Sequence, residues 1–264
     1  MKILVKLGGT LLDQDALRAS LAAQIAQAAR DGFEVVVVHG GGKQMTQYLT
    51  ERGIESRFVN GLRVTTPETM DAVVKVLAGT VNHELIAALT KAGASAVGLS
   101  GVDAGLAEAV QMDPALGAVG RVVRSNPALL CLLTANHYIP VVACLAGDSD
   151  GRMYNVNADQ MAVACAGGFR AEQLIFLTDV DGVLDFSKRL CPEVTVADCE
   201  RLIADGVATG GMQAKLNAAT AALKQGVGQV RIAPGAAPDA LARLLSGENL
   251  GTRLRRAARG GGSD

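Results

Sequence analysis

Short apolar runs alternate with longer helix-like segments along most of the chain. Residues 3–7 (ILVKL) and 35–38 (VVVV) are rich in aliphatic side chains, as expected of strands buried on both faces of a sheet. Between them, residues 13–30 are Ala-rich with helical spacing and end at Asp31-Gly32, a typical helix stop. This alternation predicts an α/β fold, a three-layer αβα sandwich with a central, mainly parallel open sheet.

The alternation continues towards the C-terminus. Further strands are expected at residues 96–99, 139–143, 174–177 and 230–233, with a hairpin arm at 59–65 and short antiparallel strands within 101–124. Further helices are expected at residues 43–51, 67–89, 158–166, 197–205, 213–224 and 237–245, and after Asn126-Pro127.

We expect residues 1–264 to form a single domain with two lobes. The N-terminal lobe is expected to end near residue 145, and the C-terminal lobe to span about 146–255. From Arg253 onward the sequence is basic and then Gly-rich, which predicts a frayed terminus, with a disordered tail over residues 256–264.

Composition excludes several classes of protein. Hydrophobic residues make up 49% and charged residues 19% of the chain, which is typical of a globular protein and not of a disordered one. The formal net charge is −1, so we expect neither a general nucleic-acid binder nor a membrane-surface binder. Aromatic residues make up only 3%, so the core must consist mostly of Ala, Val, Leu and Ile.

The five cysteines and three histidines predict no metal site. The cysteine count is odd, no pair has CxxC spacing, and the histidines stand in unrelated contexts, so we expect free thiols in a reducing compartment. The chain begins directly with a strand pattern, so no signal peptide is expected. No uninterrupted apolar stretch reaches the roughly 18 to 20 residues of a membrane span. These features predict a cytoplasmic protein.

Two glycine clusters follow predicted strands. Gly8-Gly9 follows the first strand, and Gly40-Gly41-Gly42 follows the second. In an open parallel sheet, ligands bind beyond the carboxyl ends of the strands, where glycine lets backbone N–H groups approach an anion closely. Each cluster alone is better explained as a tight strand-to-helix turn, and neither has the spacing of a P-loop or a GxGxxG motif. At equivalent places, however, the two clusters together predict a cradle for a phosphoryl group.

Lys6 is a charged residue inside an apolar strand, immediately before the first glycine cluster. Burying an ammonium group without a partner is costly. A lysine on an edge strand would reach water instead. Because Lys6 stands next to a glycine turn, an anion is the more favourable partner.

Six segments, taken together and in order, resemble the amino acid kinase family, and most closely its acetylglutamate branch. They are Lys6-Leu7-Gly8-Gly9, His39-Gly40-Gly41-Gly42, residues 61–65 (GLRVT), 155–159 (NVNAD), 178–184 (TDVDGVL) and 210–215 (GGMQAK). The first and last are shared widely in the family, whereas GLRVT with NVNAD is more specific to the branch. The resemblance covers essentially the whole chain.

The resemblance implies a role for each matching residue. Lys6 and Lys215 match the two lysines that stabilise the transferring phosphoryl group, and Asp159 matches the aspartate that orients them. Arg63 matches the arginine that binds the substrate α-carboxylate, and Asn155 matches an asparagine that binds the acetylated substrate.

The glycine turns and two loops match as well. In the family, the amides of the glycine turns contact phosphate and substrate, at positions that match Gly8, Gly9, Gly41 and Gly42. The segments that line the ATP site match Asp179, Val180, Asp181, Gly182, Val183, Leu184, Val207, Ala208 and Thr209. The resemblance therefore implies ATP with Mg²⁺, and N-acetyl-L-glutamate as the acceptor, bound by the N-terminal lobe while ATP is bound by the C-terminal lobe.

The implied reaction agrees with simple chemistry. A carboxylate with a reference pKa of about 4.3 is already an ionised nucleophile at neutral pH, so no general base is needed. The protein has to position the reactants and neutralise charge, for which two lysines, backbone amides and Mg²⁺ are suitable. Arg63 offers a planar fork that matches a carboxylate. Asp159, just inside a helix start, is placed to hold both ammonium groups.

Each matched residue also has a purely structural explanation. Asp159 suits a helix N-terminus, and Asn155 suits a turn. Arg63 is also typical of a solvated hairpin charge, and Lys215 of a surface ion pair on its helix. Asp179 and Asp181 are also typical of loop residues next to Gly182. Their joint occurrence in the family's order favours function.

Two other functions stay open. One is a kinase for N-acetylaminoadipate or for a carrier-linked glutamate, but relatives of that kind tend to alter the third glycine of the second cluster, which is intact here. The other is a non-catalytic nucleotide- or amino-acid-sensing module, because fold does not fix function. The presence of Lys6, Lys215 and Asp159 favours an enzyme.

The resemblance also bears on assembly. Arginine-inhibited hexameric members of the family carry an additional N-terminal helix that links dimers. This sequence starts just before its first strand, so the resemblance implies a homodimer formed through the N-terminal lobe.

Overall fold

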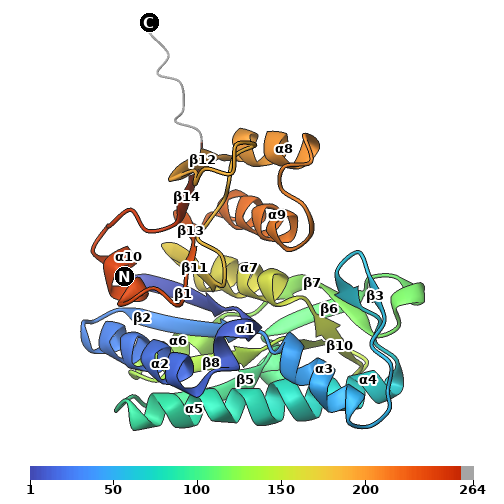
Figure 1. Ribbon diagram of the computed structural model, residues 1–264. Helices are drawn as coiled ribbons and strands as arrows, with labels where there is room; N and C mark the ends of the chain where they lie inside the picture. Colours follow the sequence, from blue (N-terminus) through green and yellow to red (C-terminus); the bar gives the residue numbers. More distant parts are fainter. Residues whose placement is uncertain (257–264) are drawn as a thin grey trace, which may run out of the picture.

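An eight-stranded sheet forms the middle layer of the molecule (Figure 1). In the computed structural model, which describes residues 1–256, its strands are β1 (Lys2–Leu7), β2 (Glu34–His39), β5 (Ala96–Ser100), β8 (Ile139–Ala143), β11 (Gln173–Thr178), β12 (Glu193–Thr195), β13 (Gln229–Pro234) and β14 (Thr252–Arg255). Their order is β12-β14-β13-β11-β1-β2-β8-β5. Within this sheet only β13 and β14 pair antiparallel. The predicted α/β class and mainly parallel open sheet are confirmed.

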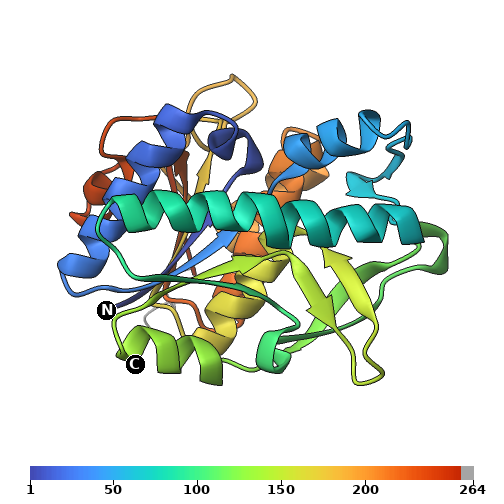
Figure 2. The ribbon, with the colours of Figure 1, turned by 90° about the horizontal axis from the view of Figure 1, so that it is seen from below.

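Helices cover both faces of this sheet, as Figures 1 and 2 show. One face carries α2 (Asp15–Arg30), α5 (Asn82–Lys91) and α10 (Ala240–Leu245), and the other carries α6 (Ala128–Ala135), α7 (Ala158–Phe169) and α9 (Gly210–Lys224), with α8 (Val196–Ala204) beside α9. Val35 and Val37 of β2 face the first helix layer, while Val36 and Val38 face the second. This confirms the interpretation of the valine run as a strand buried on both faces.

One long helix runs along the underside of the molecule (Figure 2). It consists of α4 (Pro67–Val73), the π-helical segment η1 (Val74–Val81) and α5, and it is long and apolar enough by length and composition to cross a membrane. Here it packs into the core, where the side chains of Val81, Leu85 and Leu89 are at most 1% exposed. It is the helix predicted for residues 67–89.

A small closed barrel of four strands lies beside the main sheet. It consists of β6 (Ala107–Gln111), β7 (Val119–Ser125), β9 (Leu145–Gly147) and β10 (Met153–Val156), and the short 3₁₀ turns η2 (Asp103–Gly105) and η3 (Pro114–Leu116) border it. The antiparallel β6–β7 pair confirms the short strands expected within 101–124. The hairpin of β3 (Phe58–Val59) and β4 (Leu62–Arg63) confirms the arm expected at 59–65.

The frayed terminus predicted from Arg253 onward is wrong for residues 253–255. These residues belong to β14, which pairs with β12 on one side and β13 on the other, and Leu254 is fully buried in the core. Arg256, the first residue of the expected tail, donates a hydrogen bond through Nε to the carbonyl oxygen of Leu223. The rest of that tail, residues 257–264, lies outside the described residues.

Candidate active site

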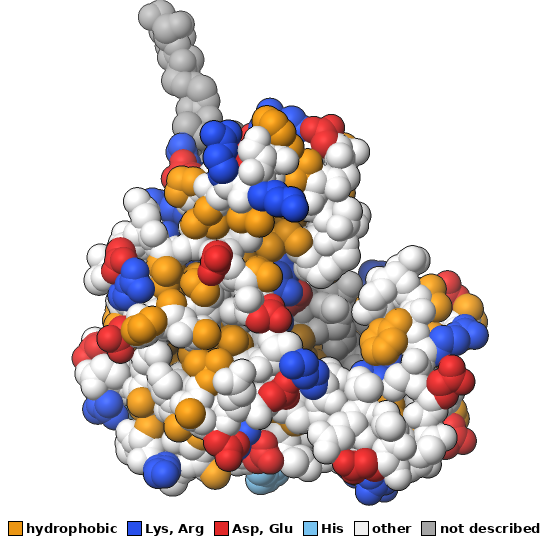
Figure 3. Space-filling model, viewed as in Figure 1, with side chains coloured by type: hydrophobic (Ala, Val, Ile, Leu, Met, Phe, Trp, Pro, Cys, Tyr) orange, Lys and Arg blue, Asp and Glu red, His pale blue; other side chains and the backbone are white. Residues whose placement is uncertain are grey.

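A cleft opens beyond the carboxyl ends of β1, β2 and β11. Figure 3 shows it as a hollow between the part that carries α8 and α9 and the part that carries α3 (Gly42–Thr50) and the β3–β4 hairpin. The pocket has a volume of about 700 Å³. It is lined by Lys6, Gly8, Gly9, Thr10, Gly42, Lys43, Thr46, Gln47, Phe58, Arg63, Thr178, Asp179 and Lys215.

The two glycine turns meet in the middle of this pocket. Gly9 begins the short helix α1 (Gly9–Leu12), and Gly42 begins α3. A Cβ at Gly9 would lie 3.0 Å from the backbone nitrogens of both Gly41 and Gly42, so the turns pack backbone against backbone and leave no room for a side chain. Within residues 1–256 the N–H groups of Gly9, Gly41 and Gly42 donate to no protein acceptor. Unpaired N–H groups at helix starts suit an anion, and the predicted cradle for a phosphoryl group at these turns stays a prediction.

Lys6, Asp159 and Lys215 form a buried ion cluster below the glycine turns. Nζ of Lys6 lies 2.8 Å from Oδ1 of Asp159, and Nζ of Lys215 lies 3.6 Å from Oδ2. The Lys6 and Asp159 side chains are 7% and 8% exposed, and that of Lys215 is 16% exposed. Lys6 lies on a central strand, so the edge-strand explanation is wrong, and its anionic partner is Asp159. Lys215 pairs with another helix, so it is not a simple surface charge.

Local structure explains why Asp159 stands there. Asn157 caps α7, and its Oδ1 accepts hydrogen bonds from the N–H groups of Asp159 and Gln160 at 2.9 and 3.3 Å. Burial raises the pKa of the Asp159 carboxyl, but the two ammonium groups outweigh burial and hold the pKa below its ordinary value. Asp159 is therefore ionised at neutral pH, and the cluster carries one net positive charge towards the pocket.

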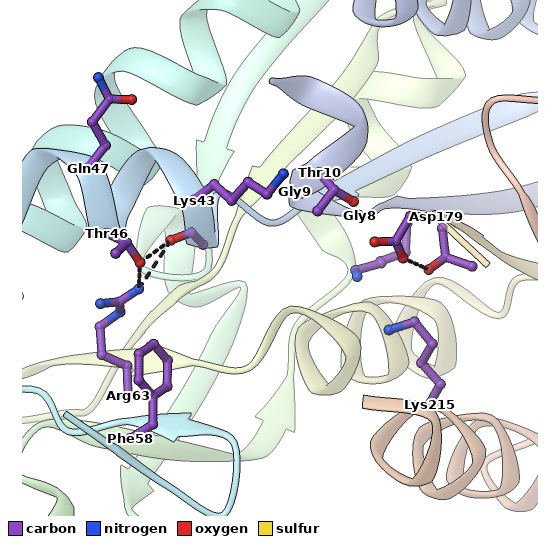
Figure 4. A pocket seen from close by; sticks show the side chains of 13 residues that line it. Gly8, Gly9, Thr10, Lys43, Thr46, Gln47, Phe58, Arg63, Asp179 and Lys215 are labelled. Atoms are coloured by element: carbon purple, nitrogen blue, oxygen red, sulfur yellow. Dashed lines mark hydrogen bonds between the residues drawn. The ribbon is translucent and has the colours of Figure 1, made fainter. Parts of the chain in front are cut away.

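Arg63 closes the opposite end of the pocket, as Figure 4 shows. Its Nη2 donates to Oγ1 of Thr46 at 2.7 Å and to the carbonyl oxygen of Gly42 at 3.1 Å, while Nη1 donates to Ser56. The guanidinium also lies 4.6 Å from the centre of the Phe58 ring. Arg63 is 8% exposed, so it is not the solvated hairpin charge considered above. Burial lowers its pKa, but its neighbours are neutral, so its charge is left for a ligand.

A smaller cavity of about 150 Å³ adjoins this end. It shares Gly42 and Arg63 with the main pocket, and Asn155, Cys144 and apolar side chains line it as well. Asn155 lies on β10, not in a turn, and its Nδ2 donates to Oγ1 of Thr65 at 3.1 Å. Arg63 and Asn155, far apart in the sequence, thus border one space.

The residues expected to line the ATP site are only partly in the main pocket. Asp179 lines the main pocket. Burial raises the pKa of its carboxyl, but hydrogen bonds from the backbone, Thr178 and Thr10, together with the charge of Lys215, have the larger effect, so the pKa lies below its ordinary value. Val183 and Ala208 point their side chains into the core. Val180, Asp181, Gly182, Leu184, Val207 and Thr209 lie on the loops around these residues, outside the pocket lining. Their contact with ATP stays a prediction.

Several pocket residues were given no role in the sequence analysis. They are Thr10, Lys43, Thr46, Gln47, Phe58 and Thr178, of which only Thr178 stands in one of the matching segments. Thr10 and Lys43 directly follow the glycine clusters, and that adjacency was the available signal. Nothing in the sequence indicates that Thr46 on α3 and Phe58 on the hairpin meet Arg63.

The described residues contain no group of three or more His, Cys, Asp or Glu side chains placed to hold a metal ion. Mg²⁺ in phosphoryl-transfer sites is usually held by substrate phosphates and one or two carboxylates. Asp179 is a carboxylate of that kind, since it lines the pocket and its lowered pKa keeps it ionised.

Known proteins match this chain over most of its length. Residues 1–234 match the family model described as "Amino acid kinase family". The chain is 70% identical to a protein of Solibacter usitatus named acetylglutamate kinase, over 96% of this chain and 99% of that protein, and 44% identical to one of the same name from Koribacter versatilis, over 93% and 95%. The crystal structure of smu.665 from Streptococcus mutans is similar with a TM-score of 0.83 at 30% identity, covering 96% of this chain and 98% of that one.

Proposed function

The chain belongs to the amino acid kinase family, and from this premise we propose that it transfers the γ-phosphoryl group of ATP to the side-chain carboxylate of N-acetyl-L-glutamate. The product is N-acetyl-L-glutamyl 5-phosphate, an intermediate of arginine biosynthesis. The protein is thus an acetylglutamate-type phosphotransferase, as its 70% and 44% identical relatives are named.

The single observation that carries the proposal is that two lysines and two glycine turns border one pocket, and that three N–H groups of these turns have no acceptor among the described residues. Lys6 and Lys215 share the Asp159 carboxylate, and the unpaired N–H groups lie on the adjoining glycine turns. Charge on a transferring phosphoryl group is spread over its three equatorial oxygens, and fixed cations and amides stabilise it without reorganisation. Asp159 holds the ammonium groups in place and leaves them one net positive charge.

The acceptor end is defined by Arg63. Its guanidinium is held by neutral acceptors and keeps a full positive charge, which suits the α-carboxylate of an amino acid. The adjoining cavity of about 150 Å³, with Asn155 at its wall, suits the acetamido group. With the substrate anchored there, its side-chain carboxylate extends towards the glycine turns and needs no general base.

ATP is expected in the C-terminal lobe, with its phosphates at Lys215 and Asp179. Asp179 is the carboxylate of the described site that would hold Mg²⁺ with the phosphates. When bound, the metal ion supplies charge neutralisation between the phosphate oxygens. The loops that contain Gly182 and Ala208 are expected to contact the nucleotide.

An ADP-release assay across acceptors tests the proposal. We expect ADP formation with N-acetyl-L-glutamate, and little with glutamate, aspartate, carbamate or UMP. Lys215→Ala is expected to lower the rate by about 10³-fold, the scale of removing a strong electrostatic donor. Lys224→Ala, an exposed lysine on the same helix, serves as the control. Near-normal ADP formation by Lys215→Ala would show that the mechanism is wrong.

The length of the acceptor is a separate question. Comparing kcat/KM for N-acetyl-L-glutamate and N-acetylaminoadipate decides it, because the second acid has one more methylene. An extra methylene changes discrimination by about 10- to 200-fold in a closely fitting pocket. A clear preference for the longer acid would transfer the proposal to that substrate.

We also propose a homodimer formed through the N-terminal lobe. The supporting observation is β5, an end strand of the eight-stranded sheet that pairs only with β8 among the described residues. An edge strand offers unpaired backbone groups to a second copy. Light scattering after gel filtration should give twice the 27.1 kDa mass of the chain.

We propose a cytoplasmic location. All five cysteines are free in the structure, as expected of a reducing compartment. Cell fractionation with an antibody against the chain tests this.

A further inference from the structure

His39 and Asn82 lie beneath the second glycine turn, outside the pocket lining. His39 is the last residue of β2 and Asn82 the first of α5, and they are 0% and 1% exposed. Nδ2 of Asn82 lies 3.0 Å from Nε2 of His39, and Nδ1 of His39 lies 2.8 Å from the carbonyl oxygen of Gly40. A continuous hydrogen-bonded chain therefore leads from the long helix to the glycine turn.

The direction of each hydrogen bond follows from Val141. Nδ2 of Asn82 also lies 2.9 Å from the carbonyl oxygen of Val141, which can only accept. The second proton of the same amide nitrogen is then directed to Nε2 of His39, so Nε2 accepts. The neutral imidazole must carry its proton on Nδ1, and this N–H donates to Gly40.

This arrangement fixes the peptide plane between Gly40 and Gly41. In a planar trans peptide the C=O and N–H bonds point in opposite directions. Because His39 holds the Gly40 carbonyl on the buried side, the N–H of Gly41 is turned to the other side. That is the side of Gly9, where a Cβ would lie 3.0 Å from the Gly41 nitrogen.

The residues packed around Asn82, His39 and Gly41 leave little free space. A Cβ at Gly98 would lie 2.2 Å from Oδ1 of Asn82, so only glycine lets the Asn82 side chain rest on β5. A Cβ at Gly41 would lie 2.6 Å from Cδ2 of Leu77, which belongs to the π-helical segment η1. Such segments often occur at functional sites. The long helix thus supports the glycine turn at two points, through Asn82 and through Leu77.

We propose that Asn82 and His39 are positioning residues for phosphoryl transfer, because they orient the Gly41 N–H towards the transferring phosphoryl group. The inference rests on the proposed function and adds to it two residues that do not touch the substrates. Misplacing a reacting group by 1 Å can cost about 10²-fold in rate. Loss of the hydrogen bonds from Asn82 through His39 to Gly40 is therefore expected to lower kcat by about 10²-fold. KM for the acetylated acid, which is bound at Arg63, should change little.

A matched pair of variants at His39 tests the inference. His39→Asn keeps an amide donor near the position of Nδ1 and so retains the hydrogen bond to Gly40. His39→Gln places its amide near the position of Nε2 instead and loses that bond. We expect His39→Asn to keep most of the wild-type kcat and His39→Gln to lose about 10²-fold, with KM nearly unchanged in both.

Asn82→Asp tests the same series of hydrogen bonds at Asn82, where the series begins. A carboxylate beside Nε2 would draw the imidazole proton from Nδ1 to Nε2 and release the Gly40 carbonyl. We expect the ¹⁵N shifts of the His39 ring to report this change of tautomer, together with a loss of kcat similar to that of His39→Gln.

Thermal unfolding of each variant separates positioning from packing. If the Asn and Gln variants at His39 have equal kcat, or if kcat follows Tm across all three variants, the inference is overturned. If the wild-type chain forms no ADP with N-acetyl-L-glutamate, the proposed function falls and the inference with it. Wild-type activity together with an unaffected His39→Gln overturns the inference alone.

Discussion

Buried charges occur at two places in the main sheet, and the two places differ in how the charges are compensated. At the pocket, Lys6 and Lys215 share the carboxylate of Asp159. At the far edge, Arg231 of β13 is paired in register with Arg253 of β14, and Arg231 is only 2% exposed. Among the described residues, Nε and Nη1 of Arg231 and Nε of Arg253 have no hydrogen-bond partner.

The difference lies in the nearby carboxylates. The pocket cluster contains one carboxylate for two ammonium groups, so a phosphoryl group completes its compensation. At the sheet edge, Glu193 stands opposite Arg253 but forms its ion pair with Arg255 at 2.5 Å. Burial and the charge of Arg253 therefore lower the pKa of Arg231, with Glu193 opposing them. At the pocket, the incomplete compensation of charge leaves a binding site for a phosphoryl group. At the sheet edge, it lowers the stability of the fold.

Asp159→Asn should have the largest effect of any change at these two places. It removes the charge that holds both lysines but keeps the size of the side chain, so two buried ammonium groups face each other. Breaking a buried ion pair costs about 3–5 kcal/mol. We expect ADP formation to fall by about 10³-fold or more, and the urea midpoint to drop.

Asp205→Asn, at an exposed position after α8, is the control for this change and should leave both measurements unaltered. Asp159→Asn activity within tenfold of wild type would show that the lysines need no shared carboxylate.

Arg63→Lys asks whether a buried charge held by neutral acceptors serves the substrate. Lysine keeps the charge but loses the planar fork. We expect KM for N-acetyl-L-glutamate to rise by about 10- to 100-fold, because a charge-assisted hydrogen bond contributes roughly 1.5–3 kcal/mol. KM for ATP should stay nearly constant. An equal rise in both KM values would contradict the assignment of Arg63 to the acceptor end.

Sequence patterns predicted the pocket side of this comparison far better than the edge side. Lys6, Asp159 and Lys215 stand in segments with fixed family spacing, and the strand-then-glycine pattern gives the layer in which they lie. The direct contact between Lys6 and Asp159 depends on α7 crossing β1, which no local pattern contains. The prediction failed at the sheet edge because Arg253 stands in a basic, Gly-rich stretch that is typical of a frayed terminus. Only the pairing of β14 with β13 and β12 buries Leu254.

His39 shows a limit of the same kind. Its position before a glycine cluster is visible in the sequence, but its partner Asn82 lies in a helix far along the chain. Burial on all sides, and not the local sequence, decides that the ring is neutral.

His39 also provides a third case, a buried titratable group that carries no charge. Burial lowers its pKa from 6.5 to about 4, although the hydrogen bond to Gly40 opposes this. A depressed pKa means that the unfolded chain takes up the proton first, so the stabilisation is complete above pH 6.5 and is lost as the pH falls towards 4. Urea unfolding should show about 2 kcal/mol less stability at pH 5 than at pH 7 from this residue.

His39→Asn removes the titrating group and serves as the matched variant. Its stability should depend less on pH between 7 and 5 than that of the wild type, by a similar amount. Parallel pH curves for the two proteins would show that folding does not shift the pKa of His39.

Arg231→Leu should have the smallest effect and the opposite sign. The substitution removes one of two like charges that face each other across β13 and β14, and it removes two buried N–H groups without partners. Replacing buried charges by apolar side chains is often neutral or stabilising by 1–4 kcal/mol. We expect a gain of about 1 kcal/mol in urea unfolding, with unchanged kcat, because Arg231 lies outside the pocket lining. Arg121→Leu, at an exposed position on β7, should change stability by less than about 0.5 kcal/mol. A loss of more than 1 kcal/mol for Arg231→Leu would mean that an anion compensates the arginine pair in solution, and the two places would then follow the same rule.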